Sequence, residues 1–360
     1  MSPARRLRIT FVLPELAAGG AERVALTLLA GLDRQRYRPT LLLLQDGGAL
    51  RRNVPQDVPV SALGRPRLRA ALTPLLAALR RADADVLFST LGYVNLAVLT
   101  LARLLPRRPR VVIREANMPS ASLERQKLAL AIRIGYRLLY PSADRVIASS
   151  QAMAGELSEN FAIAPARIHV LANPIDTDSL RQAALPLARV PGTGPRFVAC
   201  GRLTHQKGFD RLLSMLAAMP GEWHTTILGE GPDRASLQQQ AAALGIAKRV
   251  DFAGFAAEPW RWFAGADALL LPSRWEGQSN VALEALACGC PVLATPEAGG
   301  IEELALQAPG AIGIAAAGEP FIAAMRRVAP AFVDCPRPSL LPASHEAATV
   351  LRDFQRLLDG

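Results

Sequence analysis

Two glutamates eight residues apart, Glu276 and Glu284, have the surroundings that point most directly to chemistry. The apolar run 268–271 ends at Pro272 in the manner of a strand, and the loop that follows carries Glu276. Glu284 falls just inside a short helix, after which come another apolar run and a Gly-Gly pair at 299–300 that opens the next helix. Carboxylates accept paired hydrogen bonds from diols, and helix N-termini bind anions. The unit therefore suits a ligand with both hydroxyls and phosphates, such as a sugar nucleotide.

A basic loop about 70 residues upstream supplies the complementary charge. Segment 201–213 reads GRLTHQKGFDRLL, follows an expected strand and precedes an expected helix, and its Arg202 and Lys207 flank a loop closed by Gly208. A pyrophosphate leaving group gains negative charge in the transition state, and two fixed cations stabilise that charge without a metal. By itself the segment fits a solvated basic loop equally well. Its combination with the two carboxylates favours a diphosphate site.

The elements that must position these loops alternate between short apolar runs and longer helical stretches. This alternation indicates α/β architecture, with parallel sheets covered by helices on both faces. Strands are expected at 8–14, 40–44, 85–90, 110–116, 145–150, 167–174, 196–201, 224–231, 249–255, 266–273 and 291–296. Helices are expected at 21–32, 67–81, 209–218 and 345–359.

A Pro/Gly-rich stretch at 183–195 interrupts the alternation and is the expected linker. We therefore expect two Rossmann-like domains facing a central cleft, an N-terminal domain over 1–185 and a C-terminal domain over 195–344. The final helix, 345–360, is a candidate to pack back on the N-terminal domain.

The net charge of +10 is unevenly distributed. Residues 1–180 hold 25 Lys and Arg against 14 Asp and Glu, whereas residues 181–360 hold 16 against 17. This asymmetry predicts an anionic partner for the first half. Two basic amphipathic stretches there, 65–81 and 122–140 with Arg125 and Lys127, fit either an anionic lipid surface or ordinary sheet-covering helices. Nucleic acid is not expected, because basic and aromatic residues do not interleave and no known binding module is present.

Composition also argues against several other classes. The 17-residue uncharged run 86–102 contains polar residues and fits a strand followed by a helix better than a membrane span, which needs about 20 mostly apolar residues. No apolar segment follows the N-terminal arginines as in a signal peptide, so we expect a cytoplasmic protein, or one peripheral on the inner face of the cytoplasmic membrane. The four histidines are scattered, and the cysteines lack metal-site spacing, so no metal is expected. The cysteines are Cys200, Cys288, Cys290 and Cys335.

Three segments together resemble one family. The stretch 272–304 resembles the E-x7-E segment of retaining glycosyltransferases of glycosyltransferase family 4, and 201–208 resembles that family's G-R-L-x-x-Q-K-G signature. Near the N-terminus, 14–29 (PELAAGGAERVALTLL) resembles the G-G-A-E-R start of a subgroup, and 172–176 resembles its N-P-[VI]-D stretch. The resemblance covers nearly the whole chain and is strongest over 196–304.

The resemblance implies a GT-B fold and a retaining enzyme that uses a nucleotide sugar, UDP-linked rather than GDP-linked, with no cofactor or metal. In the family, the residue matching Glu276 contacts hydroxyls of the transferred sugar, the one matching Glu284 contacts the ribose, and Arg202 and Lys207 match the diphosphate ligands. The implied donor-binding set is Gly201, Arg202, Lys207, Glu276, Gly277, Gln278, Ser279, Asn280 and Glu284. The pair 278–279 departs from the family, where an aromatic residue and a small residue are usual.

The acceptor would be bound by the N-terminal domain. Gly19 and Gly20 let the backbone approach a phosphate or acceptor at a helix start. Many family members carry a histidine after the strand ending at Ile113, where this chain has 114–119 (REANMP). The G-G-A-E-R subgroup often shows an Arg/Asn pattern at this place, so the resemblance makes Arg114, Glu115 and Asn117 candidate acceptor-side residues. Glu115 would act as a base or orient the acceptor hydroxyl, and a buried structural pair of Arg114 with Glu115 is an equal interpretation.

These features predict transfer of a sugar to a saccharide or polyprenyl-linked glycolipid, in synthesis of a cell-surface polysaccharide or glycoconjugate. The expected catalytic residues are Glu276, Arg202, Lys207 and Glu115. Two alternatives remain, a GT-B sugar-nucleotide epimerase and a non-catalytic scaffold of glycan assembly. The presence of Arg202, Lys207 and Glu276 together argues against the scaffold, because an inactive site need not keep all three.

Overall fold

The computed structural model describes residues 5–17, 19–65, 67–123, 129–185, 194–331 and 337–360. The chain forms two compact units: unit 1 is Met1–Pro174 with Ala348–Gly360, and unit 2 is Ile175–Ala347. The chain thus passes between the units twice. The first passage precedes the linker expected at 183–195, so helix α7 (Thr177–Ala183) belongs to unit 2. Residues 186–193 of that segment lie outside the described residues.

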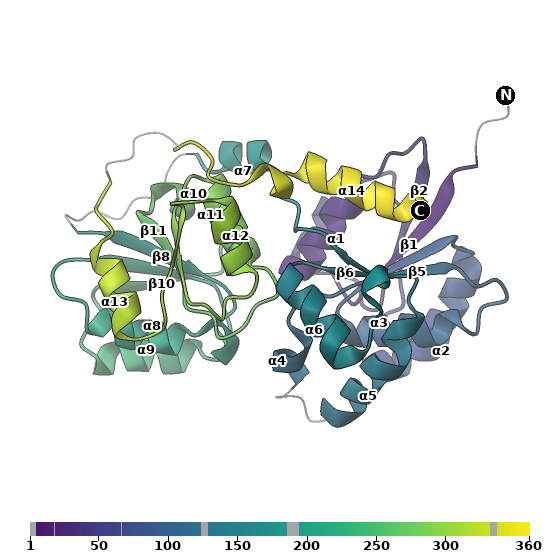
Figure 1. Ribbon diagram of the computed structural model, residues 1–360, viewed down its shortest axis with the longest axis horizontal. Helices are drawn as coiled ribbons and strands as arrows, with labels where there is room; N and C mark the ends of the chain where they lie inside the picture. The colour runs from purple at the N-terminus through teal and green to yellow at the C-terminus, as the bar shows by residue number, and fades with distance from the viewer. Residues whose placement is uncertain (1–4, 18, 66, 124–128, 186–193, 332–336) are drawn as a thin grey trace. The chain divides into compact units, whose positions relative to one another are not determined.

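Unit 1 is built on a seven-stranded sheet of order β3-β2-β1-β4-β5-β6-β7, in which every neighbouring pair is parallel (Figure 1). The strands are β1 Leu7–Leu13, β2 Tyr37–Leu43, β3 Val60–Ala62, β4 Val86–Thr90, β5 Arg110–Arg114, β6 Arg145–Ala148 and β7 Ile168–Val170. The α-helices are α1 Gly20–Ala30, α2 Leu68–Ala82, α3 Gly92–Ala102, α4 Pro119–Leu123, α5 Ala129–Leu139, α6 Gln151–Phe161 and α14 Ala347–Asp359.

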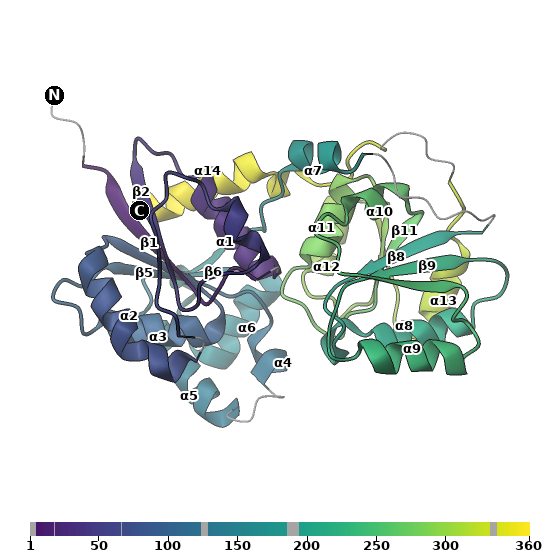
Figure 2. The same cartoon turned by 180° about the vertical axis from the view of Figure 1, so that it is seen from behind.

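Alternating strand residues divide the interior of unit 1 into two cores. Val111 and Ile113 of β5 join the core under α2, α3, α5 and α6, whereas Val112 joins the core under α1 and α14. Figures 1 and 2 show α1 and α14 on one face of this sheet, with α2 and α3 on the other. The C-terminal helix α14 is held on unit 1 by Phe354, whose ring lies 5.5 Å from that of Phe88 between centroids.

Unit 2 repeats the plan with a six-stranded sheet of order β10-β9-β8-β11-β12-β13, again parallel throughout. Its strands are β8 Arg196–Cys200, β9 His224–Leu228, β10 Val250–Gly254, β11 Ala268–Leu271, β12 Val292–Ala294 and β13 Ile312–Ile314. One face packs on α8 Phe209–Ala217, α9 Arg234–Ala243 and α13 Glu319–Arg326. The other packs on α10 Trp260–Gly265, α11 Asn280–Ala287 and α12 Ile301–Gln307, together with α7.

The alternation of apolar runs and helical stretches predicted the α/β architecture, but it did not predict two of the edge strands. Strands β3 and β13 are three residues long and partly exposed, so they lack the apolar run that marks a buried strand. The uncharged run 86–102 is a strand followed by a helix, β4 and α3, as expected. Within the part of the chain that the structure describes, no helix has both the length and the apolar character needed to cross a membrane.

Candidate functional site

The two loops singled out in the sequence follow neighbouring strands in the middle of the unit 2 sheet. Strands β8 and β11 pair directly, with Ala268 opposite Phe197, although 67 residues separate the two strands. After β8 the chain adds β9 and β10 on one side, and after β11 it adds β12 and β13 on the other. The carboxyl ends of β8 and β11 are therefore a topological switch point, where open α/β sheets bind ligands.

At this point the side chains of Lys207 and Glu276 meet. The Lys207 ammonium forms an ion pair with Oε1 of Glu276, and the Ser273 hydroxyl donates a hydrogen bond of 2.7 Å to the same oxygen. The Lys207 side chain is 16% exposed and that of Glu276 is 9% exposed, so the pair lies largely out of solvent. An ammonium and a carboxylate held together at a switch point can bind phosphate and hydroxyl groups of one ligand.

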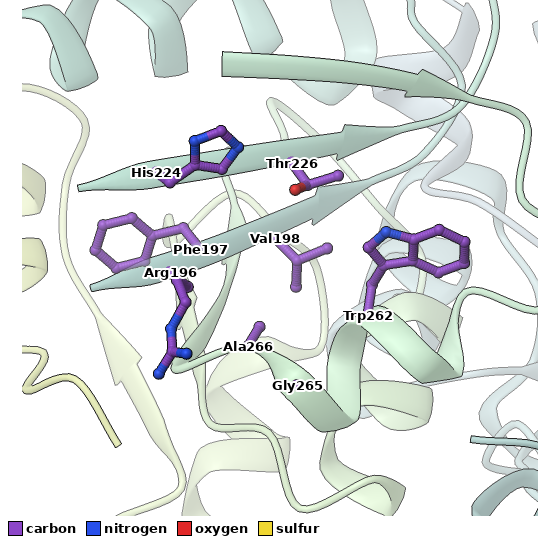
Figure 3. Close-up of a pocket in the computed structure, with 8 residues that line it drawn as sticks. All are labelled: Arg196, Phe197, Val198, His224, Thr226, Trp262, Gly265 and Ala266. Atoms are coloured by element: carbon purple, nitrogen blue, oxygen red, sulfur yellow. The ribbon is translucent and has the colours of Figure 1, made fainter. Parts of the chain in front are cut away.

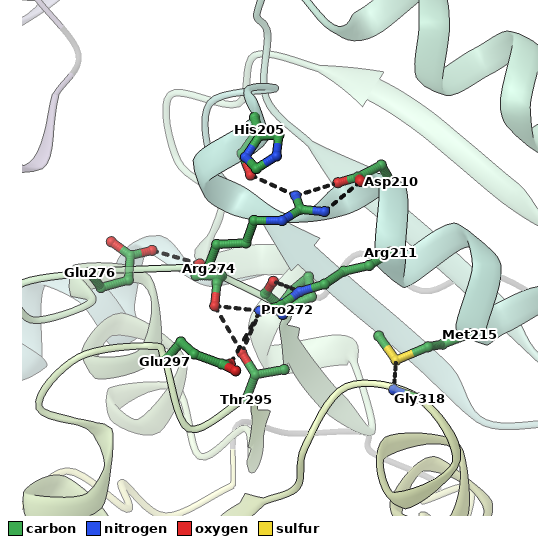
Figure 4. Close-up of polar contacts among 11 residues, drawn as sticks. His205, Asp210, Arg211, Met215, Pro272, Arg274, Glu276, Thr295, Glu297 and Gly318 are labelled. Atoms are coloured by element: carbon green, nitrogen blue, oxygen red, sulfur yellow. Dashed lines mark hydrogen bonds and ion pairs between the residues drawn. The ribbon is translucent and has the colours of Figure 1, made fainter. Parts of the chain in front are cut away.

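Two arginines fix the loops that carry this pair (Figure 4). Arg274 donates two hydrogen bonds to Asp210, of 2.7 and 2.6 Å, and a third of 2.8 Å to the His205 carbonyl. Hydrogen bonding by Arg274 also lowers the pKa of Asp210. Arg211 donates to the carbonyls of Pro272 and Ser273 at 2.7 and 2.6 Å. These bonds join the loop after β8 and the first turn of α8 to the loop after β11, and so preorganise the site.

Two glycines allow the backbone approaches that this arrangement needs. Gly208 has φ +68°, and a Cβ there would overlap the carbonyl oxygen of Pro272. Gly299 has φ +31°, and a Cβ there would overlap the carbonyl oxygen of Glu276. Any larger residue would push the loops apart, so both glycines are steric requirements of the site.

The start of helix α11 contributes the remaining predicted donor residues. Ser279 is the N-cap of α11, yet its hydroxyl caps no backbone N–H. Its Oγ is buried and has no hydrogen-bond partner among the described residues. Further along the helix, Glu284 is buried and accepts a hydrogen bond of 3.3 Å from the indole of Trp260.

The other predicted donor residues occupy the same loops. Gly201 directly follows β8, Arg202 comes next with an exposed side chain, and Gly277 and Asn280 border the start of α11. Gln278 is partly buried and lies 3.0 Å from Nε2 of His345, measured from its own Nε2. The sequence assigns His345 no motif, and only the tertiary structure brings it to this loop. Arg211 and Arg274 were also missed, since nothing in their local sequence identifies their carbonyl and carboxylate partners.

The acceptor-side candidates lie at the carboxyl edge of the unit 1 sheet. Gly19 is the N-cap of α1 and Gly20 its first residue, both beyond the end of β1. Arg114 ends β5 and is 2% exposed, and its guanidinium donates a hydrogen bond to the side-chain oxygen of Asn173. The Asn117 side chain accepts a hydrogen bond of 3.0 Å from the backbone N–H of Met118.

Glu115 is enclosed in a polar network inside unit 1. Its Oε1 accepts hydrogen bonds from the phenols of Tyr140 and Tyr136, the latter at 3.2 Å, and from the Asn95 amide at 3.2 Å. The rings of Tyr136 and Tyr140 stack with centroids 4.2 Å apart. Arg114 binds Asn173, and among the described residues no direct ion pair joins it to Glu115. The carboxylate therefore owes its position to Asn95 and the two tyrosines.

A pH dependence of stability should follow from this burial. Desolvation raises the pKa of Glu115 to about 7, against the hydrogen bonds that lower it. The folded protein therefore binds this proton more tightly than the unfolded chain, and the resulting stabilisation is complete below pH 4.5 and is lost as the pH rises through 7. Relative to E115Q, we expect the wild-type free energy of unfolding to fall by on the order of 3 kcal/mol across this range. Urea unfolding of the wild type and E115Q at about pH 4.5 and 7.5 measures this change. An equal pH dependence of the free energy of unfolding in both proteins would contradict the raised pKa of Glu115.

Other features of unit 2 do not add to the site. Among the described residues, no group of three or more His, Cys, Asp or Glu side chains is arranged to hold a metal ion. Cys288 and Cys290 are buried, and burial raises the pKa of each thiol to about 12, while Cys335 lies outside the described residues. A small cavity beside Arg196, His224 and Trp262 opens where β8 and β9 begin, at the opposite edge of the sheet from the site (Figure 3).

Comparison with known proteins agrees with this geometry. Residues 18–179 match the family model described as Glycosyltransferase Family 4, and residues 194–329 match the model described as Glycosyl transferases group 1. The chain is 29% identical over 305 residues, 80% of each chain, to the N-acetylgalactosamine-N,N'-diacetylbacillosaminyl-diphospho-undecaprenol 4-alpha-N-acetylgalactosaminyltransferase of Campylobacter jejuni. It is 25% identical over 285 residues, 77% of each chain, to the amylovoran biosynthesis glycosyltransferase AmsD of Erwinia amylovora.

A solved structure shares the fold. Anabaena HepE in complex with UDP and glucose is similar to this chain with a TM-score of 0.78, over 98% of this chain and 100% of that one, at 20% identity.

Proposed function

The chain belongs to glycosyltransferase family 4 and has the GT-B fold, and from that premise we propose that it transfers a sugar, with retention, from a UDP-sugar to a saccharide or polyprenyl-linked acceptor. The observation that carries this proposal is the meeting of Lys207 and Glu276 at the switch point of unit 2. The UDP assignment rests on the resemblance of the donor motifs and on the UDP complex of HepE.

In this proposal unit 2 binds the donor through its own side chains. Lys207 and Arg202 neutralise the diphosphate as the glycosidic bond to it breaks, and they stabilise the charge that develops on the leaving group. Glu276 accepts hydrogen bonds from hydroxyls of the transferred sugar, held in place by the Ser273 hydroxyl. Glu284 accepts hydrogen bonds from the ribose diol, and Ser279 Oγ gains the partner that it lacks.

The acceptor side is proposed to lie at the carboxyl edge of the unit 1 sheet, near Gly19, Gly20, Arg114 and Asn117. The Campylobacter relative acts on a saccharide linked to undecaprenyl diphosphate, which supports a lipid-linked acceptor here. The relatives also support a place in cell-surface polysaccharide or glycoconjugate synthesis. Glu115, although buried, is proposed to act as a base toward the acceptor hydroxyl or to orient it.

The decisive experiment measures donor binding and hydrolysis by the purified protein across UDP-, GDP- and ADP-sugars, with E276A alongside. Slow hydrolysis of one donor by the wild type, lost in E276A, supports the proposal and identifies the donor. Isomerisation of the nucleotide sugar without an acceptor would support the epimerase alternative. Binding of no donor would support the scaffold alternative.

Helix α5 is proposed to place unit 1 on an anionic membrane. Its Leu130, Ile134 and Leu138 recur every fourth residue and are 73%, 48% and 69% exposed, while Tyr136 of the same helix faces the core. Arg133 and Arg137, both exposed, lie along one side of this apolar ridge. An outward ridge of leucine and isoleucine beside arginines is the pattern of a helix lying in a lipid interface. The neighbouring Arg125 and Lys127 lie outside the described residues.

The second basic stretch, helix α2, has the ordinary pattern of a sheet-covering helix. Its Ala71, Leu75 and Leu79 are buried, and its outer face carries arginines and the 39% exposed Leu72. It therefore provides a matched control for α5.

Replacing Leu130, Ile134 and Leu138 together by glutamine should weaken binding to vesicles containing phosphatidylglycerol by about tenfold or more, because the apolar area available for insertion is lost. Co-sedimentation measures the binding, and L72Q should bind as the wild type does. Equal binding to neutral and anionic vesicles, or no effect of the triple change, would refute the membrane surface.

A further inference from the structure

The side chain of Gln278 is held by a residue far away in the sequence. Its Nε2 lies 3.0 Å from Nε2 of His345, and Nδ1 of His345 lies 3.0 Å from the Ser344 hydroxyl. That hydroxyl in turn donates a hydrogen bond of 2.8 Å to Oε1 of Gln307. His345 is 2% exposed, so its imidazole is shielded from water, whereas Ser344 and Gln307 are exposed.

The direction of each hydrogen bond follows from the groups available. Since the Gln278 amide nitrogen can only donate, Nε2 of His345 lacks a proton, and the proton of the neutral ring lies on Nδ1, which donates to the Ser344 hydroxyl. Nε2 is then an acceptor, and the Gln278 amide donates to it. A neutral imidazole satisfies all three bonds, and burial lowers the pKa of His345 to about 4. The hydrogen bond therefore orients the Gln278 side chain so that its amide N–H points toward the His345 ring.

The backbone of His345 also takes part in the return of the chain toward unit 1. Its carbonyl accepts a hydrogen bond of 2.9 Å from the N–H of Ile175, and the Ile175 carbonyl accepts one of 2.8 Å from Ala347. Ile175 is the first residue of unit 2, and Ala347 is the last before the chain returns to unit 1. His345 thus contacts Gln278 of the loop after β11 through its side chain and Ile175 through its backbone carbonyl.

We propose that His345 is a positioning residue that fixes Gln278, and through it the loop between Glu276 and the start of α11. The proposal rests on the proposed donor site. Gln278 lies between Gly277 and Ser279, whose Oγ is buried without a hydrogen-bond partner among the described residues. The contact also assigns a role to a residue at which the chain departs from its family.

Two substitutions of similar polarity separate this role from general stability. H345Q places an amide oxygen near the position of Nε2 and keeps an acceptor for Gln278, whereas H345N retains only the contact near Nδ1. Titration with the UDP-, GDP- or ADP-sugar that binds the wild type most tightly should give near-wild-type affinity for H345Q. It should give affinity about tenfold weaker for H345N, the effect of one buried hydrogen bond. Thermal unfolding of both variants checks that each is folded.

A double-mutant cycle completes the test. Q278L should weaken donor binding as much as H345N does, and H345N/Q278L should be no weaker than either single variant, since all three lack the same contact. Additive losses, or equal affinity in the wild type and all three variants of the cycle, would overturn the role of His345 while leaving the donor site intact. A wild type that binds no nucleotide sugar would overturn both the proposed function and this inference.

Discussion

Replacement of Lys207 by alanine is expected to lower the kcat of sugar transfer by about 100-fold or more, the scale of losing one preorganised charge contact in the transition state. The Lys207 ammonium is fixed by Glu276 and is mostly shielded from water, so its charge acts on the leaving diphosphate with little screening. R202A is expected to lower kcat on the same scale, because the exposed Arg202 side chain is proposed to contact the diphosphate once the donor is bound. Steady-state kinetics with the donor identified by hydrolysis measures both variants.

A matched lysine distinguishes this effect from a general loss of positive charge. Lys248 is exposed in the turn before β10, and K248A should keep wild-type kinetics. Because K207A also leaves the largely buried Glu276 without its cation, thermal unfolding must confirm that the variant is folded. Full activity of folded K207A would refute the diphosphate assignment.

E276Q is the second substitution with a large expected effect, a loss of about 100-fold or more in kcat/KM. The amide retains one acceptor oxygen for the Ser273 hydroxyl but loses the charge that holds Lys207 and one of the two acceptors proposed for the sugar hydroxyls. Since hydrogen bonds to charged groups contribute about 1.5–3 kcal/mol each, losing one or two gives an effect of this size.

Two other glutamates test whether that loss is specific. Glu319 lies on α13 with its side chain 70% exposed, so E319Q should behave as the wild type does. E284Q should raise the KM for the donor and leave kcat nearly unchanged, because ribose contacts bind ground state and transition state alike. If E276Q raised only the KM, then Glu276 would serve binding and not the transition state.

Several parts of this protein could be predicted because they are encoded locally. Arg202, Lys207 and Glu276 stand in loops that follow apolar runs, and in a parallel sheet such loops emerge at the carboxyl edge. The alternation of strands and helices predicted the α/β class for the same reason, since periodicity is a property of consecutive residues. The short edge strands β3 and β13 carry too little apolar pattern to be found this way.

The contacts that complete the site could not be predicted, because they depend on which distant segments become neighbours. Arg274 and Asp210 are 64 residues apart, and Gln278 and His345 are 67 apart. The sequence also left Glu115 open between an acceptor-side residue and a partner of Arg114. The structure places its carboxylate among two phenols and an amide from α3, α5 and the turn after α5.

The sequence by itself determined the fold class, the family and the residue types at the donor motifs, because these follow from periodicity and short-range spacing. Only the tertiary structure decided that β8 lies beside β11, so that Lys207 meets Glu276, and that the segment leading to the C-terminal helix brings His345 to Gln278. Strand order and the return of the chain are set by the burial of apolar faces against one another. That burial is a property of the whole folded chain, which no local stretch of residues encodes.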